Sequence, residues 1–223
     1  MAKRKLNCLL LIVISLSLVH CSTSRLTKPI PKGKFRAGLD IGGPIVTISD
    51  TIFPLPLSSL SLAYGLQEKI SISGALHTTA LLFGVVQLEI GGVYEVFKPK
   101  KFIPGFSVSP YLHLMFDTWE TNVKLYPEVD LNFYWDIKNG DIVYIGLTNW
   151  IEFATRKAHG QSQDQNLIWS PHVGYTFTPA MWQLSLEMKY LSPGVKNSNL
   201  IVNYHGINEY GALGLYLSAA RLF

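Results

Sequence analysis

Polar and apolar side chains alternate along most of this chain with a period of two residues. Residues 123–137 show the pattern clearly, and residues 104–116 repeat it. Alternation of this kind is typical of strands that have one apolar and one hydrated face. In the second segment the apolar face would carry Phe106, Val108, Leu112, Leu114 and Phe116, and the polar face Ser107, Ser109, Tyr111 and His113.

About ten such segments occur, each close to the length that a tilted membrane strand needs. Short, turn-like links at 65–69, 138–141 and 178–180 roughly alternate with longer links at 43–56, 154–166 and 192–208. The pattern predicts an all-β fold, an antiparallel up-and-down transmembrane β-barrel over residues 34–223, with both ends on one side of the membrane. The expected strands are 34–42, 57–66, 69–77, 85–97, 104–116, 123–137, 141–153, 167–177, 181–191 and 209–223.

Aromatic residues on the apolar faces fall near the ends of the expected strands. Rings at both membrane–water interfaces produce two such belts. One belt would hold Phe35, Tyr64, Tyr94, Phe106, Phe133, Trp135, Tyr175, Phe177, Trp182 and Phe223, and the other Phe116, Phe153, Trp169 and Tyr190. The prolines Pro110, Pro127 and Pro171 interrupt this picture, because each removes a ladder donor, so bulges or gaps in strand pairing are expected there.

The composition agrees with a barrel and excludes other classes. Hydrophobic residues make up 48% of the chain, yet no run of about 18 apolar residues follows the first twenty, which argues against membrane helices. Three of the 19 Lys and Arg residues lie within the first five positions, leaving 16 against 15 Asp and Glu. The remainder is therefore nearly neutral, and no nucleic-acid partner is expected.

The N-terminus has the layout of an export signal. Lys3, Arg4 and Lys5 precede an apolar stretch over residues 9–19 that is too short to span a bilayer. Residues 18–21, Leu-Val-His-Cys, resemble the lipobox of bacterial lipoproteins, except that His20 replaces the usual small residue. The resemblance implies cleavage after residue 20 and acylation of Cys21. Residues 21–33, polar and with two prolines, are interpreted as a lipidated flexible tether.

The C-terminal segment, residues 209–223, alternates and stops on Phe223. It resembles the terminal strand that the outer-membrane assembly machinery reads, although Ala219 and Arg221 depart from the pattern. Together the two ends resemble a lipid-modified bacterial outer-membrane β-barrel protein. This resemblance implies location in the outer membrane of a Gram-negative-type cell, with membrane lipid and the assembly machinery as partners and the oligomeric state left open.

The polar strand faces would line the lumen. With Asp117 included, nine acids would face three bases there. Such a lumen is either filled by paired and hydrated side chains or forms a narrow cation-preferring path. The candidate lining residues are Arg36, Asp40, Glu89, Glu95, Tyr111, His113, Lys124, Glu128, Asp130, Asn132, Asp136, Glu152, His172, Glu187 and Lys189.

Candidate catalytic and metal-binding residues are few. His77, His113 and His172 are expected inside, whereas an enzyme acting on membrane lipid needs a lipid-facing His beside a Ser. His113, His172, Glu128 and Asp130 lack ligand spacing, so neither a metal nor a cofactor is predicted. The expected role is therefore structural, or that of a passive small pore with an acidic lumen. The alternatives are a lipid-tethered soluble β-sandwich or barrel that acts as a binding module, and a lipid-modifying outer-membrane enzyme.

Overall fold

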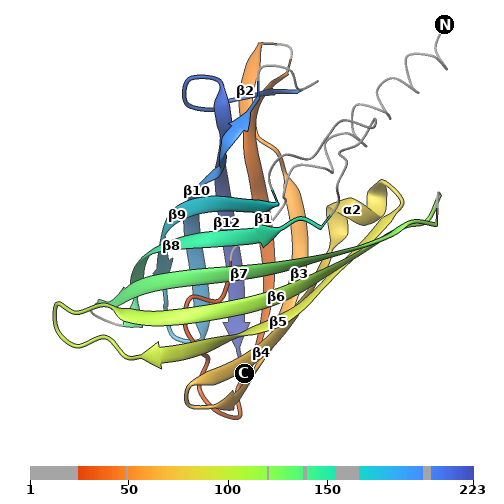
Figure 1. Cartoon of the computed structure of the whole chain (residues 1–223). Coiled ribbons are helices and arrows are strands. Elements are labelled where there is room, and N and C mark those ends of the chain that lie inside the picture. The colour runs from red at the N-terminus through yellow and green to blue at the C-terminus, as the bar shows by residue number, and fades with distance from the viewer. Residues whose placement is uncertain (1–24, 49, 120, 138–139, 154–165, 198–201) are drawn as a thin grey trace, which may run out of the picture.

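The chain forms a closed antiparallel β-barrel of ten strands, as predicted (Figure 1). The computed structural model describes residues 25–223 except 49, 120, 138–139, 154–165 and 198–201. The signal peptide predicted over residues 1–20 and the predicted acylation site Cys21 thus lie outside the described residues. The barrel strands are β1 (Phe35–Ile48), β3 (Leu57–Gln67), β4 (Ile70–His77), β5 (Val85–Phe97), β6 (Gly105–Asp117), β7 (Val123–Asp136), β8 (Ile142–Ile151), β9 (Leu167–Phe177), β10 (Trp182–Lys196) and β12 (Tyr210–Leu222).

Neighbouring strands in sequence pair with one another, and β1 closes the barrel by pairing with β12. The closing register runs from Arg36 opposite Leu222 to Pro44 opposite Gly214. The main-chain N–H of Phe223 donates to the carbonyl of Phe35 at 2.9 Å, so the beginning of β1 and the end of the chain lie side by side. Among the described strands, this closure leaves neither β1 nor β12 as an edge strand, and a closed sheet is what a β structure in lipid requires.

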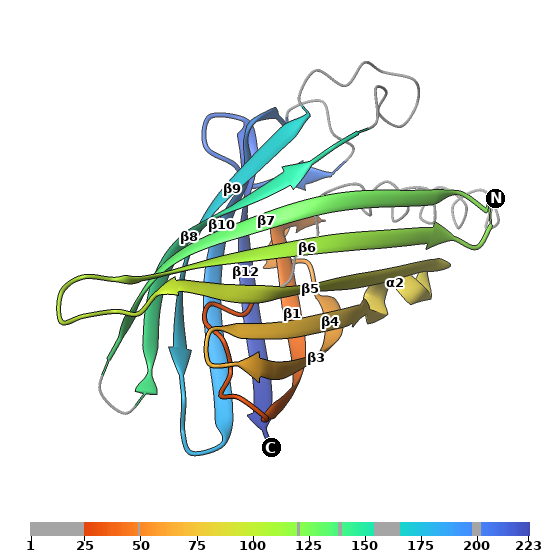
Figure 2. The ribbon, with the colours of Figure 1, turned by 60° about the horizontal axis from the view of Figure 1, so that its bottom comes forward.

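The barrel has two dissimilar ends (Figure 2). The turn rim, as we name it, is the end at which β1, β4, β6, β8 and β10 begin and β3, β5, β7, β9 and β12 end, and it carries the links 68–69, 98–104 and 178–181. The loop rim is the other end, and it carries the link 78–84 and the described parts of the longer links that follow β1, β6, β8 and β10. The alternation of mainly short and longer links thus agrees with the prediction from the sequence.

Short additional elements lie at the loop rim. Strands β2 (Thr51–Pro54) and β11 (Asn203–Tyr204) both pair with the end of β1. A helix, α2 (Thr78–Leu82), links β4 to β5. No helix within the described ranges has the length and apolar character needed to cross a membrane. A small apolar cluster holds the extension together, built from Val46, Leu55, Leu191, Val202, Tyr204 and Ala212.

The barrel wall is apolar outside and polar inside. Leu62 and Ile90 are each 68% exposed on the outer surface, whereas Glu128 and Lys189 are at most 1% exposed inside the barrel. A soluble barrel would show the reverse distribution, because its apolar face would fill the core. The exposed rings form the two predicted belts, with Phe35, Tyr94, Phe133, Tyr175, Phe177, Trp182 and Phe223 towards the turn rim and Phe116, Phe153 and Trp169 towards the loop rim.

The three prolines sit where the ladders are interrupted. Pro127 lies one residue before the β7–β8 register begins at Glu128, and Pro171 one residue before the β9–β10 register begins at His172. Near Pro110 the β5–β6 pairing pauses between Gly91 and Tyr94 without a change of register. Each proline therefore occupies a gap in which its missing donor costs no ladder hydrogen bond.

Residues 25–33 do not form the flexible tether that the sequence suggested for 21–33. Residues 25–30 run inside the barrel and residues 31–33 are exposed; we call residues 25–33 the N-terminal plug. Ile30 N–H donates to Ser71 Oγ at 3.0 Å, and Ser107 Oγ donates to the carbonyl of Thr27 at 2.5 Å. Leu26 and Ile30 are buried against Ala63 and Val93. The interpretation as a tether failed because a polar segment can satisfy its backbone groups against a polar barrel wall as well as against water.

Candidate functional site

The centre of the lumen is organised around Arg25 of the N-terminal plug. Its Nη1 donates to Glu89 Oε1 at 2.5 Å, and its Nε donates to Glu128 Oε1 at 2.9 Å. Its Nη2 lies 3.2 Å from His113 Nε2, and its guanidinium stacks 4.5 Å from the centre of the Tyr111 ring. All of these side chains are buried. Arg25 thus joins the plug to three neighbouring strands of the wall.

Strand register brings the partners of Arg25 together. Glu89 on β5 lies directly opposite His113 on β6, and Tyr111 on β6 lies directly opposite Glu128 on β7. Side chains two residues apart on a strand share a face, so all four project into the lumen. Two desolvated carboxylates on either side of β6, Glu89 on β5 and Glu128 on β7, would repel each other without a shared cation. The guanidinium supplies that charge with a planar array of donors.

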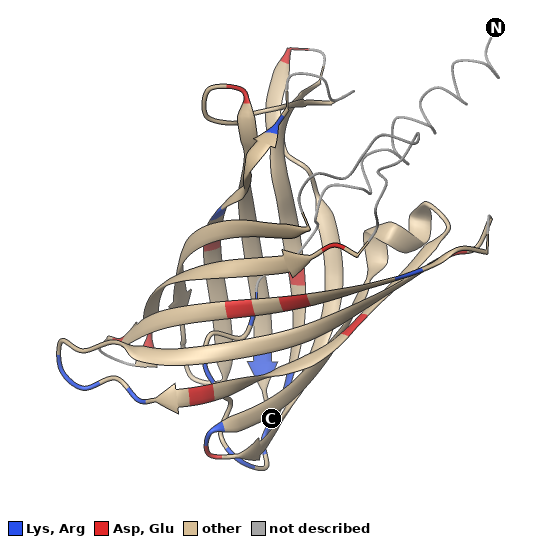
Figure 3. Cartoon of the chain, viewed as in Figure 1, with Lys and Arg blue, Asp and Glu red and all other residues tan. Residues whose placement is uncertain are grey.

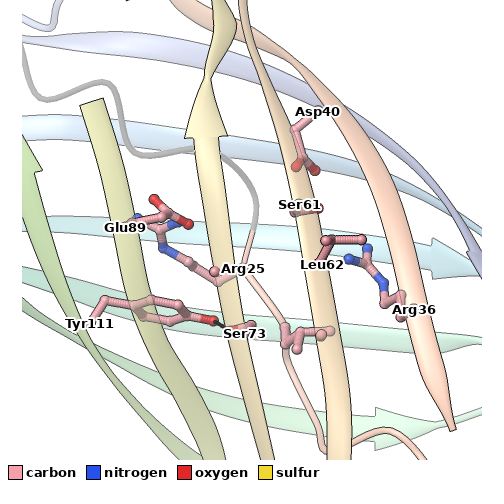
Figure 4. A pocket seen from close by; sticks show the side chains of 11 residues that line it. Arg25, Arg36, Asp40, Ser61, Leu62, Ser73, Glu89 and Tyr111 are labelled. Atoms are coloured by element: carbon pink, nitrogen blue, oxygen red, sulfur yellow. Dashed lines mark hydrogen bonds and ion pairs between the residues drawn. The ribbon is translucent and has the colours of Figure 1, made fainter. Parts of the chain in front are cut away.

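A small cavity lies beside the Arg25–Glu89 pair (Figure 4). Tyr111 reaches across it, and its hydroxyl lies 2.8 Å from Ser73 Oγ. Arg36 and Asp40 come from β1 on the far side, where Arg36 Nε donates to Gln183 Oε1 at 2.9 Å and Ser59 Oγ donates to Asp40 at 3.3 Å. The cavity therefore separates the plug from polar residues of β1.

A second polar group fills the lumen between β7, β8 and β9. Thr148 Oγ1 donates to Asp130 Oδ1 at 2.7 Å, and Asn132 Nδ2 donates to Asp130 Oδ2 at 2.6 Å. His172 Nε2 lies 2.9 Å from Asn132 Oδ1. These contacts use both oxygens of Asp130, so the group is satisfied without a residue of the plug.

A third group lies on β10 and its neighbours. Lys189 Nζ lies 3.2 Å from Glu187 Oε1 and 5.4 Å from the centre of the Tyr216 ring. Tyr144 donates to Glu187 Oε2 at 2.8 Å. On the opposite wall, nearer the turn rim, Tyr134 donates to Glu95. The buried carboxylates of Glu187 and Glu95 thus each have a cation or a tyrosine hydroxyl as a partner.

Three predicted lumen residues lie nearer the rims. Lys124 is exposed, because β7 continues past the point where its β8 partner ends and so has only β6 beside it. Asp136 is exposed at the turn rim, where it binds Lys28 of the N-terminal plug at 2.7 Å. Glu152 is half-buried just after β8. The other twelve predicted lining residues are all buried.

Lys and Arg residues also gather in the links at the turn rim, while acidic residues occupy the barrel strands (Figure 3). Lys69, Lys98, Lys100 and Lys101 lie in or beside these links, and the last turn of the N-terminal plug adds Lys32. The turn rim therefore carries a concentration of lysines, while most of the buried charged side chains of the described strands are acidic.

The described histidines are placed in the lumen or at the loop rim. His77, His113 and His172 are buried, and His205 lies beside Thr47 at the loop rim. The four residues weighed from the sequence as metal ligands form two pairs instead of one site: His113 with Glu128, and His172 with Asp130. A different group does converge within the described part of the chain, namely His77, Glu89 and His113.

Arg25 is the functional residue that the sequence interpretation missed. It lies in a segment without alternation, so no strand register assigned it to the lumen. One signal was present: the predicted lumen had nine acids and three bases, a charge excess that calls for a cation from elsewhere in the chain. The plug supplies that cation.

Comparisons with known proteins found similarity only to solved structures. No family model matches the sequence, and no curated protein matches it. Among solved structures, an outer membrane channel from Pseudomonas putida F1 has 10% identity and a TM-score of 0.46, covering 88% of this chain and 98% of that one. The outer membrane protein OprG from Pseudomonas aeruginosa has 8% identity and a TM-score of 0.33, covering 87% of this chain and 98% of that one. Ail, the attachment invasion locus protein of Yersinia pestis, has 9% identity and a TM-score of 0.29, covering 86% of this chain and 99% of that one.

Proposed function

We propose that this chain is an outer-membrane β-barrel whose acidic lumen is closed by its own N-terminal plug. The observation that carries the proposal is the burial of Arg25 between Glu89 and Glu128 in the middle of the barrel. The role is that of a structural barrel, or of a passive small pore that conducts only when the plug leaves.

The outer surface supports the membrane assignment. Exposed leucines, isoleucines and valines cover the wall between two belts of aromatic rings. That arrangement would cost a soluble protein a large area of apolar contact with water, and it fits the hydrocarbon layer of a bilayer. The export signal and the C-terminal strand that ends on Phe223 are consistent with delivery to the outer membrane and with recognition by its assembly machinery.

The buried charges support a cation preference for any open path. Within the described strands, the buried carboxylates are Asp40, Glu89, Glu95, Glu128, Asp130 and Glu187, and the buried bases are Arg36 and Lys189. Arg25 adds a third cation only while the N-terminal plug is in place. A low-dielectric wall strengthens the field of such charges, so removal of the plug leaves a lumen that attracts cations.

Replacement of the plug tests this proposal. In the variant, residues 25–32 become a Gly/Ser segment of equal length, which keeps the chain connected but removes Arg25, Leu26 and Ile30. We expect planar-bilayer recordings to show a closed wild-type protein and a conducting variant that prefers cations. Heat-modifiable gel migration of both proteins verifies that the barrel has folded. Equal conductance of the two folded proteins, or an anion preference of the variant, would contradict the proposal.

We further propose that Cys21 is acylated. Metabolic labelling with a fatty-acid analogue should tag the wild-type protein, and Cys21→Ala should remove the tag. One acyl chain supplies only marginal membrane affinity, at about 0.8 kcal/mol per buried CH₂ group. The barrel itself should therefore hold the Cys21→Ala protein in the membrane. Release of that protein by high-pH or urea washing would instead favour a lipid-tethered soluble domain.

A further inference from the structure

Three side chains from adjacent strands converge in the lumen, on the loop-rim side of its middle. His77 is the last residue of β4, Glu89 lies on β5 and His113 on β6. His77 Nε2 lies 3.0 Å from Glu89 Oε2, and His113 Nδ1 lies 3.7 Å from the same oxygen. One atom from each residue falls within 4.8 Å of the other two, and all three residues are buried. We propose that this group binds a divalent transition-metal ion, with Zn²⁺ as the best fit.

His113 provides the observation that points to a ligand. Its side chain is fully buried, yet Nδ1 has no hydrogen-bond partner among the described residues. A buried polar atom without a partner costs free energy, so its presence calls for an explanation. Because Nδ1 is on the side of the ring that faces Glu89 Oε2, a metal ion between them would use its lone pair.

Two groups contact His113 Nε2, namely Glu128 Oε2 and Arg25 Nη2, each at 3.2 Å. The guanidinium can only donate, so a proton on Nε2 is donated to Glu128, and this is the tautomer that the metal-bound site requires. Nδ1 is then unprotonated and able to coordinate. Metal-binding histidines commonly donate their other ring N–H to a carboxylate, which orients the ring and strengthens the ligand. Glu128 is thus a positioning residue for the proposed site.

Arg25 leaves the coordinating atoms accessible. It binds the other oxygen of Glu89, Oε1, and leaves Oε2 to the histidines. Two carboxylates and one guanidinium give the group one net negative charge when both imidazoles are neutral, so a cation is the ligand of matching sign. Coordination through His77 Nε2 requires the neutral imidazole to carry its one proton on Nδ1, so that proton moves from Nε2 to Nδ1 and the charge of the group is unchanged.

The donor atoms favour zinc over harder cations. Two imidazole nitrogens and one carboxylate oxygen are a common set for Zn²⁺, and they leave a fourth position for water. Mg²⁺ and Ca²⁺ prefer sites made entirely of oxygen. Zinc bound to three strands and, through Glu89, to Arg25 would also strengthen the attachment of the N-terminal plug.

Metal titration of the full-length protein tests the proposal. The protein, purified in detergent and stripped with a chelator, is dialysed against Zn²⁺ and its metal content is measured. We expect one Zn²⁺ per chain, at least tenfold weaker binding for His77→Gln and His113→Gln, and a rise in the wild-type unfolding temperature on adding Zn²⁺. The positioning variant Glu128→Gln should lose roughly 10- to 100-fold in affinity.

His172→Gln is the matched control, since His172 is a buried lumen histidine outside the group. It should bind Zn²⁺ as the wild-type protein does. His77→Gln is the decisive variant because His77 ends its strand, and heat-modifiable migration shows whether the variant has folded. Less than one Zn²⁺ per wild-type chain, or equal weakening by His77→Gln and His172→Gln, would overturn the proposal. Should His77→Gln not fold, failure of Zn²⁺ to stabilise the wild-type protein would also overturn it.

Discussion

Arg25→Met is expected to lower the free energy of unfolding by about 3–5 kcal/mol, the usual cost of removing one partner from a buried ion pair. The variant leaves Glu89 and Glu128 facing each other without their shared cation, and both are buried. Urea unfolding of the protein in phospholipid vesicles, followed by tryptophan fluorescence, measures the loss.

The triple variant Arg25→Met, Glu89→Gln, Glu128→Gln separates the charge effect from the loss of contacts. It removes the unpaired carboxylates together with the guanidinium, so most of the lost stability should return. If the triple variant is as unstable as Arg25→Met, packing around the N-terminal plug matters more than its charge. A single variant as stable as the wild-type protein would show that Arg25 does not hold the plug in the lumen.

Leu186→Arg is expected to cost about 2–4 kcal/mol of stability in a bilayer, the range for a cation at mid-membrane on a barrel wall. Leu186 is 49% exposed on the outer face of β10, midway between Trp182 and Tyr190 near the two ends of the membrane-facing strand. Unfolding in vesicles measures the loss. The guanidinium would have to reach the interface or thin the bilayer around it.

Leu186→Ala provides the control for side-chain size. Leu186→Ala removes apolar contact without adding charge, so it should lower the free energy of unfolding in vesicles much less than Leu186→Arg does. In detergent micelles the gap between the two variants should narrow, because water reaches the surface more easily there. Equal losses for Arg and Ala in vesicles would mean that position 186 does not face hydrocarbon.

The barrel could be predicted from the sequence because the signals that define its strands lie close together along the chain. A period of two residues, short turns and aromatic strand ends are each visible within a few positions, and together they define the wall and its register. Leu186 and Glu187 show the consequence: neighbours in sequence, they lie on opposite faces, as alternation predicts.

The N-terminal plug could not be predicted in the same way. Arg25 is 64 residues from Glu89 and 103 from Glu128, and no periodic signal connects them. Alternation placed His77, Glu89 and His113 on the inner face, but only strand register and the end of β4 show that they meet. Lys124 lies opposite Met115 yet is exposed, since alternation defines a face but not the point at which a neighbouring strand ends.

The depth of Arg25 limits where an acyl group on Cys21 can be. Glu89, His113 and Glu128 each lie eight positions from the turn-rim end of their strands, about 26 Å along the strand. Cys21 precedes Arg25 by four residues, and a fully extended chain of that length reaches about 14 Å at most. With the guanidinium held in the lumen, Cys21 therefore stays within about 14 Å of the Arg25 backbone. An acyl group on Cys21 and the burial of Arg25 would constrain each other, and release of the N-terminal plug would lengthen the chain between the lipid and its attachment at β1.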